Sequence, residues 1–214
     1  MMLLVAVPLS DKAHYDALAR QLSLCLDTAP DGCDRPQMKN ARDEDRLAAV
    51  LVPLIWRDFE WQILMTKRAA HLSNHAGQIS FPGGALDASD KGLIDTALRE
   101  AHEEISLAPL SVKVMGSLLP VRSPAGYIVQ PIVGIIGGDV FTELRPDPAE
   151  VDSIFTLPLA HIGQPDNFSL VPRQTNGRDN SYWVVSHSEH YIWGLSARVL
   201  NDLRQRLYHC QTVA

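Results

Sequence analysis

The sequence predicts an α/β protein in which helices and strands do not alternate regularly. Three segments have apolar residues at helical spacing, namely 10–24, 93–106 and 193–208. The clearest strand-like runs between them are 48–56 and 128–136, which are rich in β-branched and apolar residues. The resulting order of helix, strands, helix, strands and helix is typical of the α/β class.

The N-terminal part, residues 1–45, is expected to be a helix followed by a linker. Ser10 stands before the helical segment, and Tyr15, Leu18 and Leu22 fall on one side of it together with Cys25. Residues 28–45 contain prolines, glycine and many charges without periodicity, which predicts a linker. We expect the main domain to span 46–214.

The main domain is expected to begin with a hairpin and to end with a helix. Residues 57–60 separate two strand-like runs and predict the turn of that hairpin. An acidic, proline-containing loop is expected at 143–152. The predicted strands are 48–56, 61–66, 112–119, 128–136, 153–157 and 182–186.

Composition excludes several classes of protein. With 214 residues, 46% of them hydrophobic and a net charge of −6, the chain should be a globular protein with a sizeable core. Its acidity argues against general binding to nucleic acid or anionic membranes. Three distant cysteines indicate neither a disulfide framework nor a zinc site. Residues 1–9 lack a basic region and no apolar run spans a bilayer, so we expect a cytoplasmic protein.

The central helical segment carries a cluster of carboxylates beside its apolar stripe. Glu100, Glu103 and Glu104 share one flank and, as neighbours three and four apart, repel one another. A divalent cation would reverse that penalty, because Mg²⁺ prefers oxygen ligands and is commonly held by carboxylates together with substrate phosphates. The apolar stripe consists of Ile94, Ala97, Leu98, Ala101 and Ile105. The cluster therefore suggests metal-assisted chemistry on phosphates.

A glycine turn before this helix completes a pattern that resembles the signature of the Nudix hydrolase family, G-x5-E-x7-R-E-U-x-E-E-x-G-U, where U is a bulky aliphatic residue. The residues in register are Arg99, Glu100, Glu103, Glu104 and Leu107. The chain departs from the signature at Ala101 and at Ser106, where the family has glycine. Counted from Gly84, the spacer is one residue longer, and Asp90 or Lys91 takes the place of the first Glu.

A second pattern is similar to the coenzyme A diphosphatase branch of that family. Its matching residues are Leu64, Thr66, Arg68, Ala69, Gly77, Phe81, Pro82, Gly83 and Gly84. The late segment 191–195 and the segment 126–136 also resemble this branch. Ser73 stands where the branch has an arginine, so we expect weaker affinity for coenzyme A than in a typical member.

The resemblance implies an α/β/α sandwich around a mixed sheet, formed by a Nudix hydrolase domain at 46–214 with an N-terminal helical extension. It also implies Mg²⁺- or Mn²⁺-dependent hydrolysis of coenzyme A to 3′,5′-ADP and 4′-phosphopantetheine. Arg99 would orient the glutamates, and the general base would be either Glu100 or Glu150. The implied metal ligands are Glu100, Glu103, Glu104 and the backbone carbonyl of Gly84. The implied substrate-binding residues are Arg68, Gly77, Phe81, Pro82 and Gly83.

Three other interpretations stay open at this stage. The chain could hydrolyse another nucleotide derivative, such as NADH, ADP-ribose or an aberrant nucleoside triphosphate. It could be a non-catalytic nucleotide-binding regulator on the same fold, or a purely structural α/β protein with an acidic helix. A small-molecule substrate is the expected partner, and the sequence leaves a homodimer open.

Overall fold

A computed structural model describes residues 12–29, 38, 42, 44–175 and 178–209. The expectations for residues 1–9, Ser10, Cys33 and Cys210, and for most of the predicted linker, therefore lie outside the described residues. None of the described helices combines the length and the apolar character needed to cross a membrane.

The described residues form four α-helices and eleven strands. The helices are α1 (Lys12–Cys25), α2 (Leu93–Ile105), α3 (Leu159–Gly163) and α4 (Leu195–His209). The first seven strands are β1 (Arg46–Arg57), β2 (Glu60–Arg68), β3 (Ile79–Ser80), β4 (Gly83–Ala85), β5 (Val112–Ser117), β6 (Val121–Arg122) and β7 (Tyr127–Ile136). The last four are β8 (Val151–Pro158), β9 (Phe168–Thr175), β10 (Arg178–His187) and β11 (His190–Trp193). Short 3₁₀ helices occur at Pro109–Ser111, Gly138–Glu143 and Pro165–Asn167.

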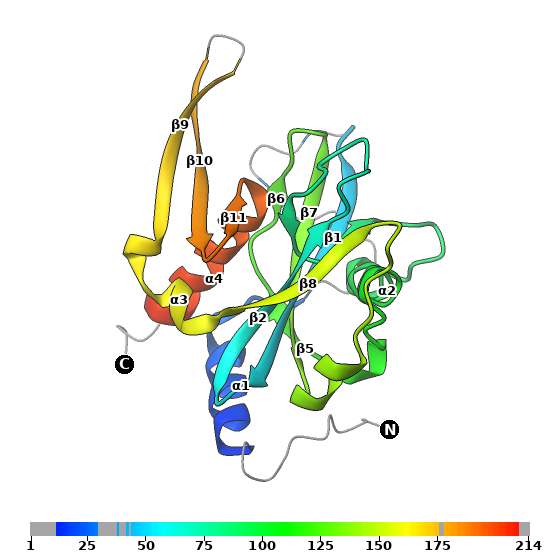
Figure 1. Cartoon of the computed structure of the whole chain (residues 1–214), viewed down its shortest axis with the longest axis vertical. Helices are drawn as coiled ribbons and strands as arrows, with labels where there is room; N and C mark the ends of the chain where they lie inside the picture. The colour runs from blue at the N-terminus through cyan, green and yellow to red at the C-terminus, as the bar shows by residue number, and fades with distance from the viewer. Residues whose placement is uncertain (1–11, 30–37, 39–41, 43, 176–177, 210–214) are drawn as a thin grey trace.

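The larger sheet is mixed, as predicted, with the order β3-β2-β1-β7-β5 (Figure 1). β1 and β7 run parallel over ten paired positions, whereas β2, β4, β5 and β6 make antiparallel pairs. β8 adds a further antiparallel strand beside β2.

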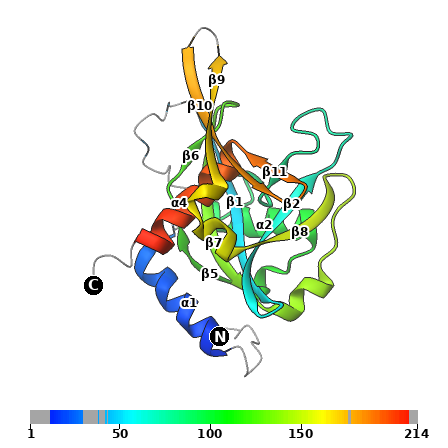
Figure 2. The same ribbon diagram turned by 60° about the vertical axis from the view of Figure 1, so that its left-hand side comes forward.

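Helices cover both faces of this sheet, which confirms the α/β/α sandwich. Successive strand residues point to opposite faces. In β1, Leu51 and Ile55 pack with α2, whereas Val52 and Leu54 pack on the side of α1 and α4. Figures 1 and 2 show α2 on one side of the sheet, with α1 and α4 on the other.

The predicted N-terminal helix is present as α1, and its apolar side belongs to the main core. Leu18, Leu22 and Cys25 are buried in the same hydrophobic cluster as Val52 and Leu203. Arg206 of α4 binds Asp27 just after α1, with 2.7 Å between Nη2 and Oδ2.

The sequence did not predict β9, which pairs with β10 in a second sheet of order β11-β10-β9. This hairpin extends away from the rest of the molecule (Figures 1 and 2). The strand contains Pro172, and proline argues against a central strand because it lacks a backbone N–H. It is accommodated here because β9 is an edge strand.

The glycine turn before α2 lies where β2 separates from β1. β1 pairs with β2 only from Leu54 to Arg57, and the same edge of β1 pairs with β4 from Ala48 to Val50. Gly83 makes this pairing possible, because a Cβ on it would collide with the backbone of Ala49 and Val50. The glycine turn therefore lies directly between the sheet and α2.

Candidate active site

Arg99 connects the glycine turn to the carboxylates of α2. Its guanidinium donates to both carboxylate oxygens of Asp90, at 2.8 and 3.0 Å. It also donates to Glu100 and Glu103, each at 2.9 Å, and to the carbonyl of Ala85 at 3.1 Å. The side chain is thus fixed by five hydrogen bonds that fit the rigid fork of a guanidinium. It holds two of the predicted ligands in place.

The sequence assigns Asp90 or Lys91 to the position of the early acidic ligand and does not predict that Asp90 binds Arg99. Asp90 is buried and accepts hydrogen bonds from Arg99, from Thr96 Oγ1 at 2.9 Å and from the backbone N–H of Asp87 at 2.9 Å. The bonds from Arg99 lower the pKa of Asp90 to about 2. Lys91 is exposed. The available signal was an Asp that shortly precedes a helix and an Arg nine residues later.

The three glutamates differ in burial, contrary to the single anionic flank expected. The exposed fraction of the side chain is 56% for Glu103, 17% for Glu100 and 3% for Glu104. Glu104 lies seven residues after Ala97, nearly two helical turns, so it falls on the apolar stripe itself. Gly84 packs so closely against Glu100 that a Cβ at position 84 would collide with the Glu100 carboxylate.

The Glu104 carboxylate is buried, and its hydrogen bonds and ion pair only partly replace the water that it loses. Among the residues that the structure describes, its Oε2 is the only buried side-chain nitrogen or oxygen without a hydrogen-bond partner. Its Oε1 lies 3.5 Å from Nη1 of Arg68. Burial raises the pKa of Glu104 to about 8, with Arg68 opposing the rise and the charges of Glu150 and Glu100 adding to it. Burial also raises the pKa of Glu100, with Arg99 opposing that rise.

The loop before β8 brings Glu150 to this cluster. Its backbone closes the C-terminal end of α2, since Asp147 N–H donates to the Glu104 carbonyl at 2.9 Å. The carbonyl of Glu150 accepts from Ala69 N–H at 2.9 Å, next to Arg68. The side chain of Glu150 is exposed, and its charge raises the pKa of both Glu100 and Glu104.

The predicted substrate-binding residues fall into two groups. Arg68 is beside Glu104, and Gly77 occupies an exposed turn with φ +69 that returns the chain to β2 through a 3.1 Å bond from its N–H to the Arg68 carbonyl. Phe81 is buried in the core, and Pro82 is buried with its carbonyl accepting from Leu51 N–H at 2.9 Å. The buried side chains of Phe81 and Pro82 thus lie directly before the glycine turn and anchor it to the core.

The residues present fit a divalent cation. A buried carboxylate oxygen without a partner, on a glutamate whose pKa is raised by burial and by the charges of Glu150 and Glu100, is the environment that a hard cation would stabilise. In the described part of the chain, no three acidic, histidine or cysteine side chains already form a ligand set. Arg99 donates hydrogen bonds to Glu100 and Glu103 and holds their carboxylates on one side of α2.

We expect Gly84→Ala to lower activity by about 10- to 100-fold, because the added methyl group displaces the Glu100 carboxylate. Steady-state kinetics and thermal unfolding of the variant test this. Gly163→Ala is the matched control, because a Cβ on Gly163 would likewise collide with a side chain, that of Tyr208, and not with the glutamates. Equal activity in the two variants would contradict a role for the close packing at Gly84.

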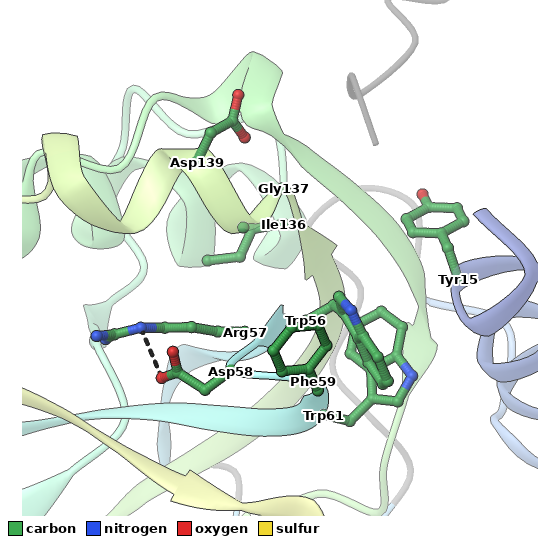
Figure 3. A pocket seen from close by; sticks show the side chains of 10 residues that line it. Tyr15, Trp56, Arg57, Asp58, Phe59, Trp61, Ile136, Gly137 and Asp139 are labelled. Carbon is green, nitrogen blue, oxygen red and sulfur yellow. Dashed lines mark ion pairs between the residues drawn. The ribbon is translucent and has the colours of Figure 1, made fainter. Parts of the chain in front are cut away.

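A separate hollow of about 350 Å³ lies at the opposite end of β1 (Figure 3). Its aromatic lining comes from Tyr15, Trp56, Phe59 and Trp61. Seven residues of extended strand, roughly 20 Å, separate Trp56 from Ala49, which pairs with Gly84. The hollow is therefore not part of the glutamate site.

Comparison with known proteins gives consistent matches. The family model of the NUDIX domain matches residues 45–175. The chain is 38% identical over 169 residues to an uncharacterized Nudix hydrolase, NudL, of Enterobacter sp. (strain 638), which covers 79% of this chain and 86% of that protein. It is 40% identical over 169 residues to the NudL of Salmonella typhimurium, with the same coverage.

A solved structure of a C. elegans Ap4A hydrolase is similar with a TM-score of 0.46 and 17% identity, over 53% of this chain and 80% of that one. The range matched by the family model includes every predicted site residue, from Arg68 to Glu150.

Proposed function

This chain belongs to the Nudix family, and from this membership and the geometry of its site we propose that it hydrolyses the pyrophosphate bond of coenzyme A. The products would be 3′,5′-ADP and 4′-phosphopantetheine. The observation that carries the reaction type is the buried Glu104 carboxylate, with an oxygen that has no partner, beside Arg68. The pattern at 64–84 supports coenzyme A as the substrate.

The proposed ligands of Mg²⁺ or Mn²⁺ are the carboxylates of Glu100, Glu103 and Glu104 and the carbonyl of Gly84. When bound, the cation neutralises phosphate charge and acidifies a water molecule. Arg99 keeps Glu100 and Glu103 oriented, and Asp90 in turn fixes Arg99. The site is thereby preorganised, which reduces the free energy spent on arranging charges during the reaction.

Arg68 is proposed to bind the diphosphate. Its side chain is 24% exposed and lies at the end of β2, next to Glu104. A guanidinium binds phosphate oxygens through two parallel hydrogen bonds. A cation held by Glu104 would leave the Arg68 guanidinium available to the substrate phosphates.

Glu150 is our choice over Glu100 for the general base, because Glu100 already accepts a 2.9 Å bond from Arg99. Glu150 is exposed and its charge acts on both Glu100 and Glu104, so it can accept a proton from water at the edge of the site. We expect Glu150→Gln to lower kcat by about 10²-fold or more with little change in metal affinity. A kcat within twofold of wild type would return the role to Glu100.

A panel of substrates tests the proposal. Purified protein is incubated with Mg²⁺ or Mn²⁺ and with coenzyme A, an acyl-coenzyme A, NADH or ADP-ribose, and the products are identified by mass. Release of 3′,5′-ADP from coenzyme A at the highest kcat/KM supports the proposal. Preferential cleavage of NADH or ADP-ribose would support another diphosphate hydrolase, and binding without cleavage would support the nucleotide-binding regulator.

A further inference from the structure

A groove of about 490 Å³ lies between the end of β2, β3 and the β10–β11 hairpin. One wall contains Lys67, Gly77 and Gln78, and the other contains Tyr191 and Trp193. The two aromatic residues also line an adjoining hollow of about 350 Å³ together with Arg173 and Tyr182. This aromatic wall lies beyond residue 175, where the match to the family model ends.

The aromatic wall is one face of the smaller sheet. Tyr191 pairs with Ser186 and Trp193 with Val184, so both rings lie on the same side of the sheet. The intervening Ile192 and its partner Val185 are fully buried in the core on the other side. The sheet therefore has one face that packs against the core and one face that carries aromatic rings.

Contacts among the rings hold this face in place. Tyr182 and Trp193 meet edge to face with 5.7 Å between ring centroids. A hydrogen bond with Tyr182 raises the pKa of Tyr191. Tyr191 nevertheless remains 51% exposed. Fixed but accessible rings suit a flat ligand, because stacking then orders few additional groups.

The groove adjoins the proposed diphosphate site at the end of β2. Lys67 lines the groove, whereas the next residue, Arg68, contacts Glu104. The pairing of β2 with β8 shifts register between these two residues. Gly77 also belongs to both regions, since it lines the groove and its N–H binds the Arg68 carbonyl. A ligand that crosses the end of β2 can therefore reach both the groove and the proposed diphosphate site at Arg68.

We infer that this groove binds the adenine base of the substrate, stacked on Tyr191 and Trp193, while the diphosphate lies at Arg68 and the glutamates. The inference rests on the proposed function, which supplies an adenine nucleotide as the substrate. Arg173, in the adjoining hollow, provides a guanidinium for a phosphate carried by the ribose. Base stacking on aromatic side chains tolerates different bases, so the groove contributes affinity more than selectivity among purines.

Titration calorimetry with AMP, 3′,5′-ADP and 4′-phosphopantetheine in the presence of Mg²⁺ tests this inference. Tyr191→Ala should weaken the binding of AMP and 3′,5′-ADP about tenfold, the loss expected for one stacking partner. Binding of 4′-phosphopantetheine should not change. Tyr191→Phe, which keeps the ring, should bind AMP within twofold of wild type.

Leu170→Ala is the surface control, because Leu170 is 54% exposed on β9 and pairs with Trp183, on the other face of the same sheet. The inference is wrong if wild-type protein does not bind AMP, or if Tyr191→Ala binds AMP as wild type does. Selective loss of 4′-phosphopantetheine binding would also overturn it and assign the groove to the other end of coenzyme A. AMP binding does not require turnover, so these results are independent of whether coenzyme A is cleaved.

Discussion

We expect Glu104→Gln to reduce metal-dependent turnover by about 10³-fold or more while the fold remains intact. The substitution keeps the shape of a buried side chain and removes the charge that is proposed to bind the cation. Steady-state kinetics with Mg²⁺ and circular dichroism of the same preparation test both parts. Full activity in this variant would contradict the proposed ligand.

The same variant should be more stable than wild type when a chelator is present at pH 8. Because the pKa of Glu104 is raised to about 8, the folded protein keeps a proton that the unfolded chain loses near pH 4.5. The free energy of unfolding of wild type should therefore fall as pH rises through this interval, on the order of 5 kcal/mol in total. Glutamine does not titrate, so the variant should lack this loss.

Addition of Mg²⁺ should reverse the order of stability, since a ligand of the folded state alone stabilises it. Glu103→Gln serves as the matched control, because Glu103 is exposed and its removal relieves no buried charge. Parallel pH profiles for wild type and Glu104→Gln in the chelator would contradict the burial of an ionisable group at this position.

Arg99→Ala should lower both stability and activity. The substitution removes the guanidinium that donates to both carboxylate oxygens of buried Asp90, which costs about 3 kcal/mol of unfolding free energy. It also frees Glu100 and Glu103, and loss of such orienting contacts typically reduces activity by about 10- to 100-fold. Denaturant unfolding and kinetics at a temperature where the variant is folded measure the two effects.

The double variant Arg99→Ala/Asp90→Asn separates these effects. It should recover part of the stability, because asparagine carries no charge at this buried position, but it should not recover activity. The pKa of Asp90 is lowered to about 2, so the stability from this pair is present above about pH 4 and disappears as pH falls through 2. A stability loss in Arg99→Ala that stays constant down to pH 2 would contradict the ion pair as its source.

Most of the fold could be predicted because its larger elements have clear periodicity. The predicted helices correspond to α1, α2 and α4, and the predicted hairpin to β1 and β2. The strands β3, β4, β6 and β11 have two to four residues, too few for a pattern. Their positions depend on contacts between distant segments, which sequence periodicity does not report.

The end of α2 shows how local chemistry can differ from a family pattern without changing the fold. Ser106 occupies the left-handed region, with φ 58 and ψ 24, where glycine carries no steric penalty. Its hydroxyl donates to the Arg145 carbonyl at 3.2 Å, which ties the helix end to the loop that carries Glu150. The position is thus compatible with serine here.

The sequence indicates which residues belong to the candidate site, but not how buried each of them is or what it contacts. The spacing of Glu100, Glu103 and Glu104 indicated a common flank, whereas packing of β4 against α2 buries Glu104 and leaves Glu103 exposed. The function of Asp90 depends on the conformation of the turn before α2. The groove at Tyr191 depends on the unpredicted short strand β11 and on its pairing with β10.

The most direct test is the rate of 3′,5′-ADP release from coenzyme A by wild-type protein as the concentration of Mg²⁺ or Mn²⁺ increases. We expect no release in the presence of a chelator, and a rate that rises with metal concentration to saturation, with 4′-phosphopantetheine formed in equal amount. Release that persists in the chelator, or no release at any concentration of either metal, would contradict metal-dependent coenzyme A hydrolysis at the glutamates of α2.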